Sequence, residues 1–365
     1  MTRVAAAVAA LALALTACGE PSAVDPRAEV VVSGQVLHAD GTPVQGGTAM
    51  VIKEIGPDDF AASAPLFFGT MGISCLAGID LDLCDEAGAR ADVADDGTFS
   101  VRLRGRDVQS GFGTVSTMWA TAAAPSDGDL AGASASSAFT VGSESVQLPA
   151  LRLWEPAVGV VEENGGVTVD VPRLPGEYGS DPRYEVRFES AEGALLWAAR
   201  RRELPVDARV LEDAVHAVAV EASVDDAPGG SRATYRTAQA RLAGPGAPPS
   251  RGAACATHRP GHGRVAHEPC PFTDGDLDEA FDAGGRSVVI DLGETRPVDL
   301  VVIRGDTDTF VVHTSEDGRT WQRLATLETT REHAALDAPP ATHARYVRVR
   351  AQRGVLPALR ELSIW

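Results

Sequence analysis

The chain has 365 residues, a formal net charge of −19 and a hydrophobic fraction of 44%. Most of the negative charge falls in residues 19–249, where 34 acidic side chains face 17 basic ones, and this argues against nucleic acid and anionic lipid surfaces as partners. Aromatic residues are few at 5%, whereas glycine and proline number 37 and 23, which favours turn-rich β modules over a large enzyme.

Residues 1–17 have the features of an export signal, with Arg3 ahead of an uncharged run from Val4 to Ala17. The run is shorter than the roughly 20 apolar residues that span a bilayer. Residues 15–19 read LTACG, which resembles the bacterial lipobox, where cleavage precedes a cysteine that then receives lipid. The resemblance implies a lipid on Cys18 that anchors the protein to the cell membrane or the outer membrane. A non-lipidated secretory signal is the alternative, and both place the protein outside the cytoplasm.

The other four cysteines form two local pairs, Cys75 with Cys84 and Cys255 with Cys270. An even number of cysteines in an exported protein favours disulfides. The second pair encloses His258, His262 and His267, so a zinc site made of these histidines and the two thiolates is an alternative.

After a lipidated tether at 18–27, residues 28–153 carry the segments VSGQV (32–36), DGTPV (40–44) and DGTF (96–99). Asp-Gly between alternating apolar residues predicts hairpins. The pattern resembles the carboxypeptidase-regulatory, transthyretin-like β-sandwich family, which implies a structural or adhesive spacer. Residues 55–90 do not fit the pattern, and we expect an insertion closed by the Cys75–Cys84 disulfide.

Residues 156–243 contain short strand-like runs separated by turn signals, which predicts a β-sandwich. The segments YEVRF (184–188) and ATYRT (233–237) resemble a fibronectin type III domain. The usual early core tryptophan is missing, and Trp197 is the expected substitute. Residues 244–254 are rich in proline and glycine and predict a linker.

Residues 255–365 contain an ordered series of motifs: FTDGDL (272–277), IDLG (290–293), SEDGRTW (315–321) and ARYVRV (344–349). The series resembles a discoidin (coagulation factor type C) domain, a galactose-binding-like jelly roll. The predicted fold class is therefore all-β, with three tandem sandwiches. The resemblance implies that loops at one end of this domain bind sugars, or less often lipids or proteins.

Two candidate sites follow in this domain. Asp274, Asp276 and Asp278, with Asp282 nearby, crowd the loop that calcium braces in the family, and carboxylates are the ligands that calcium prefers; a solvated acidic turn is the alternative. The candidate ligand-binding residues are Arg304, Asp306, Asp308, His333 and Arg353. None of them is aromatic, and we expect Trp321 and Tyr346 in the core.

No G-x-S-x-G, H-E-x-x-H or P-loop motif occurs, so a non-enzymatic protein is expected. The sequence thus predicts a lipid-anchored extracytoplasmic protein that presents a discoidin-like domain to a glycan or another envelope ligand. A structural or protein-binding component of a surface assembly, with no sugar site, is the alternative.

Overall fold

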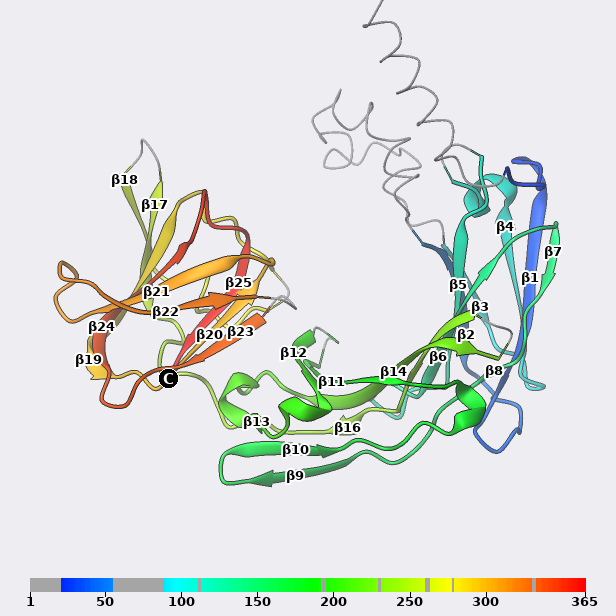
Figure 1. Ribbon diagram of the computed structural model, residues 1–365, viewed down its shortest axis with the longest axis horizontal. Helices are drawn as coiled ribbons and strands as arrows, with labels where there is room; N and C mark the ends of the chain where they lie inside the picture. The colour runs from blue at the N-terminus through cyan, green and yellow to red at the C-terminus, as the bar shows by residue number, and fades with distance from the viewer. Residues whose placement is uncertain are drawn as a thin grey trace, which may run out of the picture. The chain divides into compact units, whose positions relative to one another are not determined.

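A computed structural model describes residues 21–54, 88–110, 113–191, 193, 195–228, 231–259, 263–277, 279–329 and 333–365. Its regular elements are strands and short 3-10 turns (Figure 1), so the predicted all-β class is confirmed. No helix of the described residues is long and apolar enough to cross a membrane. Cys18, Cys75, Cys84 and most of the 55–90 segment lie outside the described residues.

The chain forms two compact units. The first contains the described part of Met1–Ala157, together with Pro172–Tyr184 and Val220–Gln239; the second contains Val158–Val171, Glu185–Ala219 and Ala240–Trp365. Residues 156–243, expected as one domain, are therefore divided between the units. The boundaries of the three expected domains, and the resemblance of the first two to named families, stay predictions.

The first unit packs two sheets around an apolar core. One has the order β4-β1-β7, with β8 also paired to β1; the other contains β15-β6-β5-β2-β3, with the later part of β14 beside β15. The strands and turns are β1 (Glu29–Leu37), β2 (Thr48–Lys53), β3 (Gly88–Asp92), β4 (Thr98–Arg104), η1 (Gly105–Val108), β5 (Thr117–Ala123), β6 (Ser134–Thr140), β7 (Ser145–Gln147), β8 (Leu151–Arg152), η2 (Gly176–Tyr178) and β15 (Ser231–Arg236).

The glycine of the VSGQV segment has a steric role. Gly34 pairs with Phe99 across β1 and β4, and a Cβ at residue 34 would lie 2.7 Å from the Phe99 ring. Along β4 each second side chain is buried, as expected of a strand with one face on a core. Gly34 therefore makes room for the aromatic ring that this core needs.

The second unit contains three short sheet segments from the middle of the chain. β13 pairs with β10 and β10 with β9; β12 pairs with β11; and β16 pairs with the first part of β14. Both β11 and β14 contain residues of the two units. The elements are β9 (Gly159–Glu163), β10 (Gly166–Asp170), β11 (Arg183–Glu189), β12 (Leu195–Arg200), η3 (Arg201–Glu203), β13 (Val206–Asp207), η4 (Ala208–Val210), β14 (Ala217–Ala227) and β16 (Ala240–Arg241).

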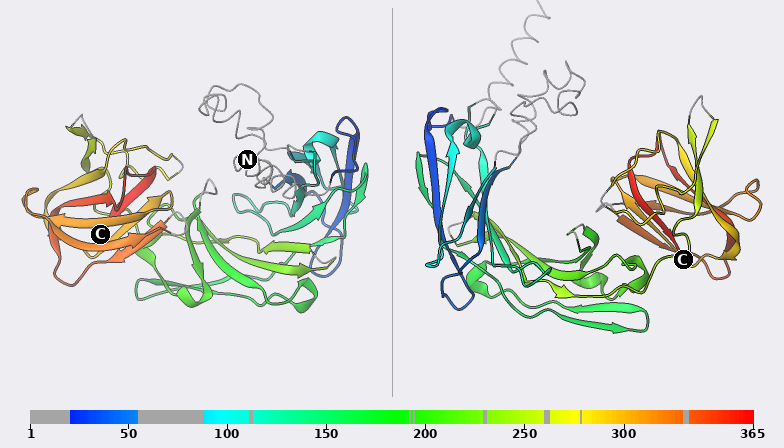
Figure 2. Two further views of the ribbon diagram at one scale, coloured as in Figure 1. Left: turned by 45° about the horizontal axis from the view of Figure 1, so that its top comes forward. Right: turned by 180° about the vertical axis from the view of Figure 1, so that it is seen from behind.

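The C-terminal part of the second unit is a two-layer sandwich (Figure 2). A six-stranded sheet has the order β18-β17-β19-β24-β21-β22, and a three-stranded sheet the order β23-β20-β25. The strands are β17 (Ala254–Arg259), β18 (Gly263–His267), β19 (Ser287–Pro297), β20 (Leu300–Gly305), β21 (Thr309–Ser315), β22 (Gln322–Glu328), β23 (His333–Asp337), β24 (His343–Ala351) and β25 (Leu359–Ile364). Val288, Ile290, Phe310, Val347 and Leu362 are among the fully buried residues between the layers.

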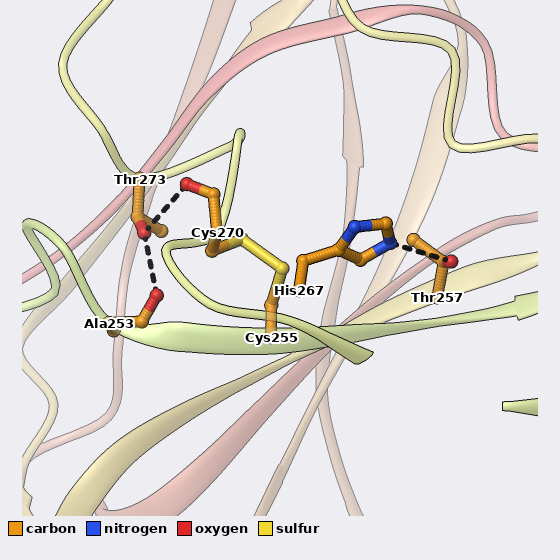
Figure 3. The surroundings of a disulfide bond; sticks show 6 residues. All are labelled: Ala253, Cys255, Thr257, His267, Cys270 and Thr273. Carbon is orange, nitrogen blue, oxygen red and sulfur yellow. Dashed lines mark hydrogen bonds between the residues drawn. A yellow bond between two sulfur atoms is a disulfide. The ribbon is translucent and has the colours of Figure 1, made fainter. Parts of the chain in front are cut away.

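The predicted Cys255–Cys270 disulfide is present, with the Cα atoms 5.2 Å apart (Figure 3). His267 beside it points to Thr257, whose hydroxyl lies 3.2 Å from Nε2. The disulfide uses both thiols that the zinc alternative would need, and the described residues form no group of His, Cys, Asp and Glu that could hold a metal.

Removing this disulfide should destabilise the sandwich. The bond closes a loop with a sequence separation of 15 residues, and a loop of that length corresponds to roughly 3 kcal/mol of stabilisation by chain entropy. We expect Cys255→Ser/Cys270→Ser to lower the free energy of unfolding by about this amount in urea melts. An unchanged melt would show that the bond contributes nothing to stability.

Candidate functional site

Three of the five predicted ligand-binding residues lie on neighbouring loops at one end of the sandwich. Asp306 and Asp308 follow β20, and Arg353 follows β24. These loops are joined by backbone hydrogen bonds from Asp306 to the Ala358 carbonyl (3.0 Å) and from Gln352 to the Thr309 carbonyl (2.7 Å). Asp306 and Arg353 are exposed. We call residues 306–308 and 352–358 the loop end.

The loop end offers polar groups but no stacking surface. Its described residues include no aromatic side chain. The Asp308 carboxylate accepts a hydrogen bond from the Thr309 N–H (2.6 Å), and the Thr329 hydroxyl accepts one from the Asp308 N–H (2.9 Å). Asp306 and Arg353 are therefore the charged side chains of this group that face solvent.

The other two predicted residues, Arg304 and His333, contact the middle of the chain instead. They are paired across β20 and β23. The His333 ring stacks on Trp197 with centroids 4.0 Å apart, and its Nε2 accepts a hydrogen bond from the Ala198 N–H (2.9 Å). Arg304 has a side chain only 3% exposed. The structure therefore places both residues in contacts within the second unit, with Arg304 buried and His333 half-buried.

Arg304 forms a buried ion pair with Glu212. Arg304 Nη1 donates to Glu212 Oε1 over 2.6 Å, and the Glu212 side chain is 0% exposed. Arg304 also donates to the Val210 carbonyl, and Ser363 donates to Glu212. Arg251 contacts the second oxygen of Glu212 at 2.9 Å. Loss of one member of this network should be strongly destabilising, because removing one partner of a buried ion pair costs about 3–5 kcal/mol of folding stability.

Glu361 adds a second buried carboxyl beside Arg304, its cross-strand neighbour on β20. It is fully buried, and the Gly275 N–H donates to its Oε2 over 3.2 Å. Burial, followed by the charge of Glu212, raises the pKa of Glu361 from 4.5 to about 8, against the opposing effects of Arg304 and Arg251. Glu361 is therefore protonated at neutral pH.

In the predicted calcium loop, three aspartate side chains accept backbone hydrogen bonds that stabilise its turns. Asp274 accepts a hydrogen bond from the Asp276 N–H (3.0 Å), Asp276 from the Glu279 N–H (3.2 Å) and Asp282 from the Gly284 N–H (2.7 Å). Asp278 lies outside the described residues. A calcium ion at this loop stays a prediction.

The sequence did not lead us to predict a candidate site on the outer side of the six-stranded sheet. His313 on β21 pairs with Arg348 on β24 and with Arg323 on β22. Arg350 is the next outward residue of β24 and is exposed. We call His313, Arg323, Arg348 and Arg350 the arginine face. The alternation in VRVRA at residues 347–351 would have revealed it, because charges at every second position mark a solvent-facing side of a strand.

Two aromatic residues border the arginine face. Trp321 and Tyr346, expected in the core, are half-buried. The Arg348 guanidinium lies 4.3 Å from the Trp321 ring centroid, and Arg345 lies 5.0 Å from that of Tyr346. Both contacts are cation–π interactions. Arg345 is also held by Asp291 through bonds of 2.9 and 3.1 Å, which lower the pKa of Asp291.

Glu361 predicts a specific pH dependence of stability. A carboxyl whose pKa is raised on folding stabilises the folded state below its unfolded pKa, and that contribution is lost as pH rises towards the folded pKa. We therefore expect stability to fall between pH 5 and about 8. Glu361→Gln should remove most of this fall and exceed the wild type in stability at pH 9, measured by thermal melts. The same slope in both proteins would contradict the assignment.

Comparison with known proteins finds a family match in the C-terminal part of the chain. The F5/8 type C domain family matches residues 269–361. No curated protein matches the chain. Among solved structures, a carbohydrate-binding module of CpGH89 produced by Clostridium perfringens is similar at 18% identity over 25% of this chain and 79% of that one, with a TM-score of 0.23.

Two further solved structures are similar over a comparable region. The CBM32 of AlyQ, in complex with 4,5-unsaturated mannuronic acid, has 20% identity over 31% of this chain and 93% of that one, with a TM-score of 0.26. A second Clostridium perfringens CpGH89 module, in complex with GalNAc-β-1,3-galactose, has 18% identity over 31% and 93%, with a TM-score of 0.25. On the family match and the two-layer sandwich, the chain carries a discoidin domain of the F5/8 type C family at residues 269–361.

Proposed function

We propose that this protein is a non-enzymatic, lipid-anchored extracytoplasmic protein whose discoidin domain binds carbohydrate of the cell envelope or its surroundings. The observation that carries the proposal is the F5/8 type C match at residues 269–361, which lies within a complete two-layer sandwich. Sugar binding is a property that the family resemblance implies. The remaining β-rich part of the chain would serve as a spacer.

Glycan binding is the most direct test of this proposal. The purified full-length chain should bind a subset of glycans on an array, in calcium and in EDTA as separate arms. Loss in EDTA alone would support calcium at the loop of Asp274 and Asp276. The absence of binding to every glycan in both arms would contradict the carbohydrate proposal.

One observation favours a second candidate function, a structural or protein-binding role. The described residues of the loop end lack the aromatic side chain on which a sugar ring normally stacks. Recovery of one stoichiometric protein partner after cross-linking on intact cells, combined with a silent glycan array, would favour this role.

The anchor is proposed from the LTACG segment at residues 15–19. Lipid at Cys18 would hold the protein on a membrane, since each buried methylene contributes about 0.8 kcal/mol. Cys18→Ala should abolish incorporation of labelled fatty acid and shift the protein out of the membrane fraction. Ser22→Ala, four residues further on, is the matched control and should remain in the membrane. Retention of Cys18→Ala in the membrane would show that lipid at this residue is not the anchor.

A further inference from the structure

The arginine face is built on the central strand of the six-stranded sheet. β24 lies between β19 and β21. Its Val347 and Val349 enter the core, so Arg348 and Arg350 project from the opposite side and stand about 7 Å apart along the strand. Arg323 lies two strands away, about 10 Å across the sheet. The cationic groups therefore cover an extended area and not a single point.

The acidic side chains that the structure describes do not pair with these arginines. Among the residues that the structure describes, Arg323, Arg348 and Arg350 have no acidic partner within 4.0 Å. The nearby turn residue Asp317 is held by the N–H groups of Arg319 and Thr320, and this lowers its pKa to about 2. The chain as a whole has a net charge of −19. Three arginines without described carboxylate partners therefore give this sheet surface a positive charge, opposite in sign to that of the chain.

The surface beneath the arginines is closed and apolar. Val289 and Val311 lie on the outer side of β19 and β21, opposite Arg348 and Arg350, yet they are only 6% and 4% exposed. The alkyl parts of arginine side chains can cover apolar surface in this way, and Arg348 is itself half-buried, with its Nε shielded from solvent. Burial and then the charges of Arg348, Arg350 and Arg323 lower the pKa of His313, so His313 is neutral between them at pH 7.

We propose that the arginine face binds an acidic polysaccharide, with carboxylate or sulfate groups on Arg323, Arg348 and Arg350 and a sugar ring beside Trp321. The inference rests on the proposed carbohydrate-binding function and assigns it a ligand class and a surface distinct from the loop end. The strands of this surface, β19, β24, β21 and β22, carry other charged residues as well. Asp291 pairs with Arg345, Glu294 pairs with Arg296, and Glu328 lies at the far end of β22, opposite Thr309.

Arginine chemistry matches this ligand. The planar guanidinium donates two parallel hydrogen bonds to a carboxylate or sulfate, and arginines spread over the surface match a polymer that repeats its anionic groups. The half-buried ring of Trp321, at the border of the arginine face, offers an apolar contact to a sugar ring. The acidic remainder of the chain disfavours a large anionic membrane or nucleic acid, whereas a single flexible glycan chain needs only this surface.

The test compares the purified full-length wild-type chain with two double variants of Arg348 and Arg350 and with one control variant. Polygalacturonate is the acidic probe and dextran the neutral one, with affinity measured by gel retardation and calorimetry at low and high salt. Arg348→Gln/Arg350→Gln should lower affinity for polygalacturonate about tenfold or more, since charged hydrogen bonds contribute about 1.5–3 kcal/mol. Arg348→Lys/Arg350→Lys should retain part of it, because charge remains and the bidentate geometry is lost.

The matched control is Arg102→Gln/Arg104→Gln. These residues have the same two-residue spacing and outward direction on β4, so net charge changes equally, and binding should stay at the wild-type level. Circular dichroism melts check that each variant is folded. Wild-type affinity in Arg348→Gln/Arg350→Gln would overturn the proposal, as would binding to vesicles of anionic phospholipid in preference to polygalacturonate. Binding of neutral glycans alone would overturn this inference and leave the proposed function standing, whereas no binding of any carbohydrate would remove both.

Discussion

Strand β24 is the constraint on which the C-terminal domain depends. As an inner strand of the six-stranded sheet it pairs on both sides, with β19 and with β21. The pairing register of β24 therefore cannot shift by one residue. Such a shift would move Val347 and Val349 out of the core and bring Arg348 and Arg350 into it. The packing of the core thus fixes the direction of Arg348 and Arg350. Stability and surface charge are set by the same strand.

The opposite sheet is constrained by charge. Arg304 and Glu361 on β20 and β25 face away from the core and are buried. Arg304 donates to Leu196, Val210 and Glu212, and Glu361 accepts from the Gly275 N–H. A buried arginine and glutamate give little net stability, but they penalise any arrangement that leaves one unpaired. This network links residues 210–212 to the domain through Arg304, and His333 packs separately on Trp197. The loop end and the arginine face are the two surfaces of the domain that we propose as candidates for ligand binding.

The sequence was informative where a local pattern has one physical cause. Alternation in ARYVRV predicted a strand, and the Asp-Gly pairs predicted turns. Two cysteines close in sequence, in a chain expected to be exported, predicted the disulfide between Cys255 and Cys270. Each of these rests on contacts within a motif or between motifs that recur together.

Other features depend on partners distant in the chain. Arg304 and Glu212 are 92 residues apart, and no pattern in either segment connects them, so the sequence predicted Arg304 as a ligand-binding residue and not as a partner of Glu212. Trp321 was expected in the core because tryptophan in a strand motif usually packs there. It lies instead at the edge of the sheet beneath Arg348. Such side-chain pairings are decided by tertiary packing, which a single sequence does not encode locally.

The central claim is that the discoidin domain engages carbohydrate through the outer side of its large sheet. Arginine footprinting tests it most directly: the full-length chain is treated with phenylglyoxal, with and without an oligogalacturonate, and each arginine is quantified by mass spectrometry. The account predicts that the ligand protects Arg323, Arg348 and Arg350 and leaves Arg353 and Arg102 reactive. Protection confined to Arg353, or equal reactivity at every arginine with and without ligand, would contradict it.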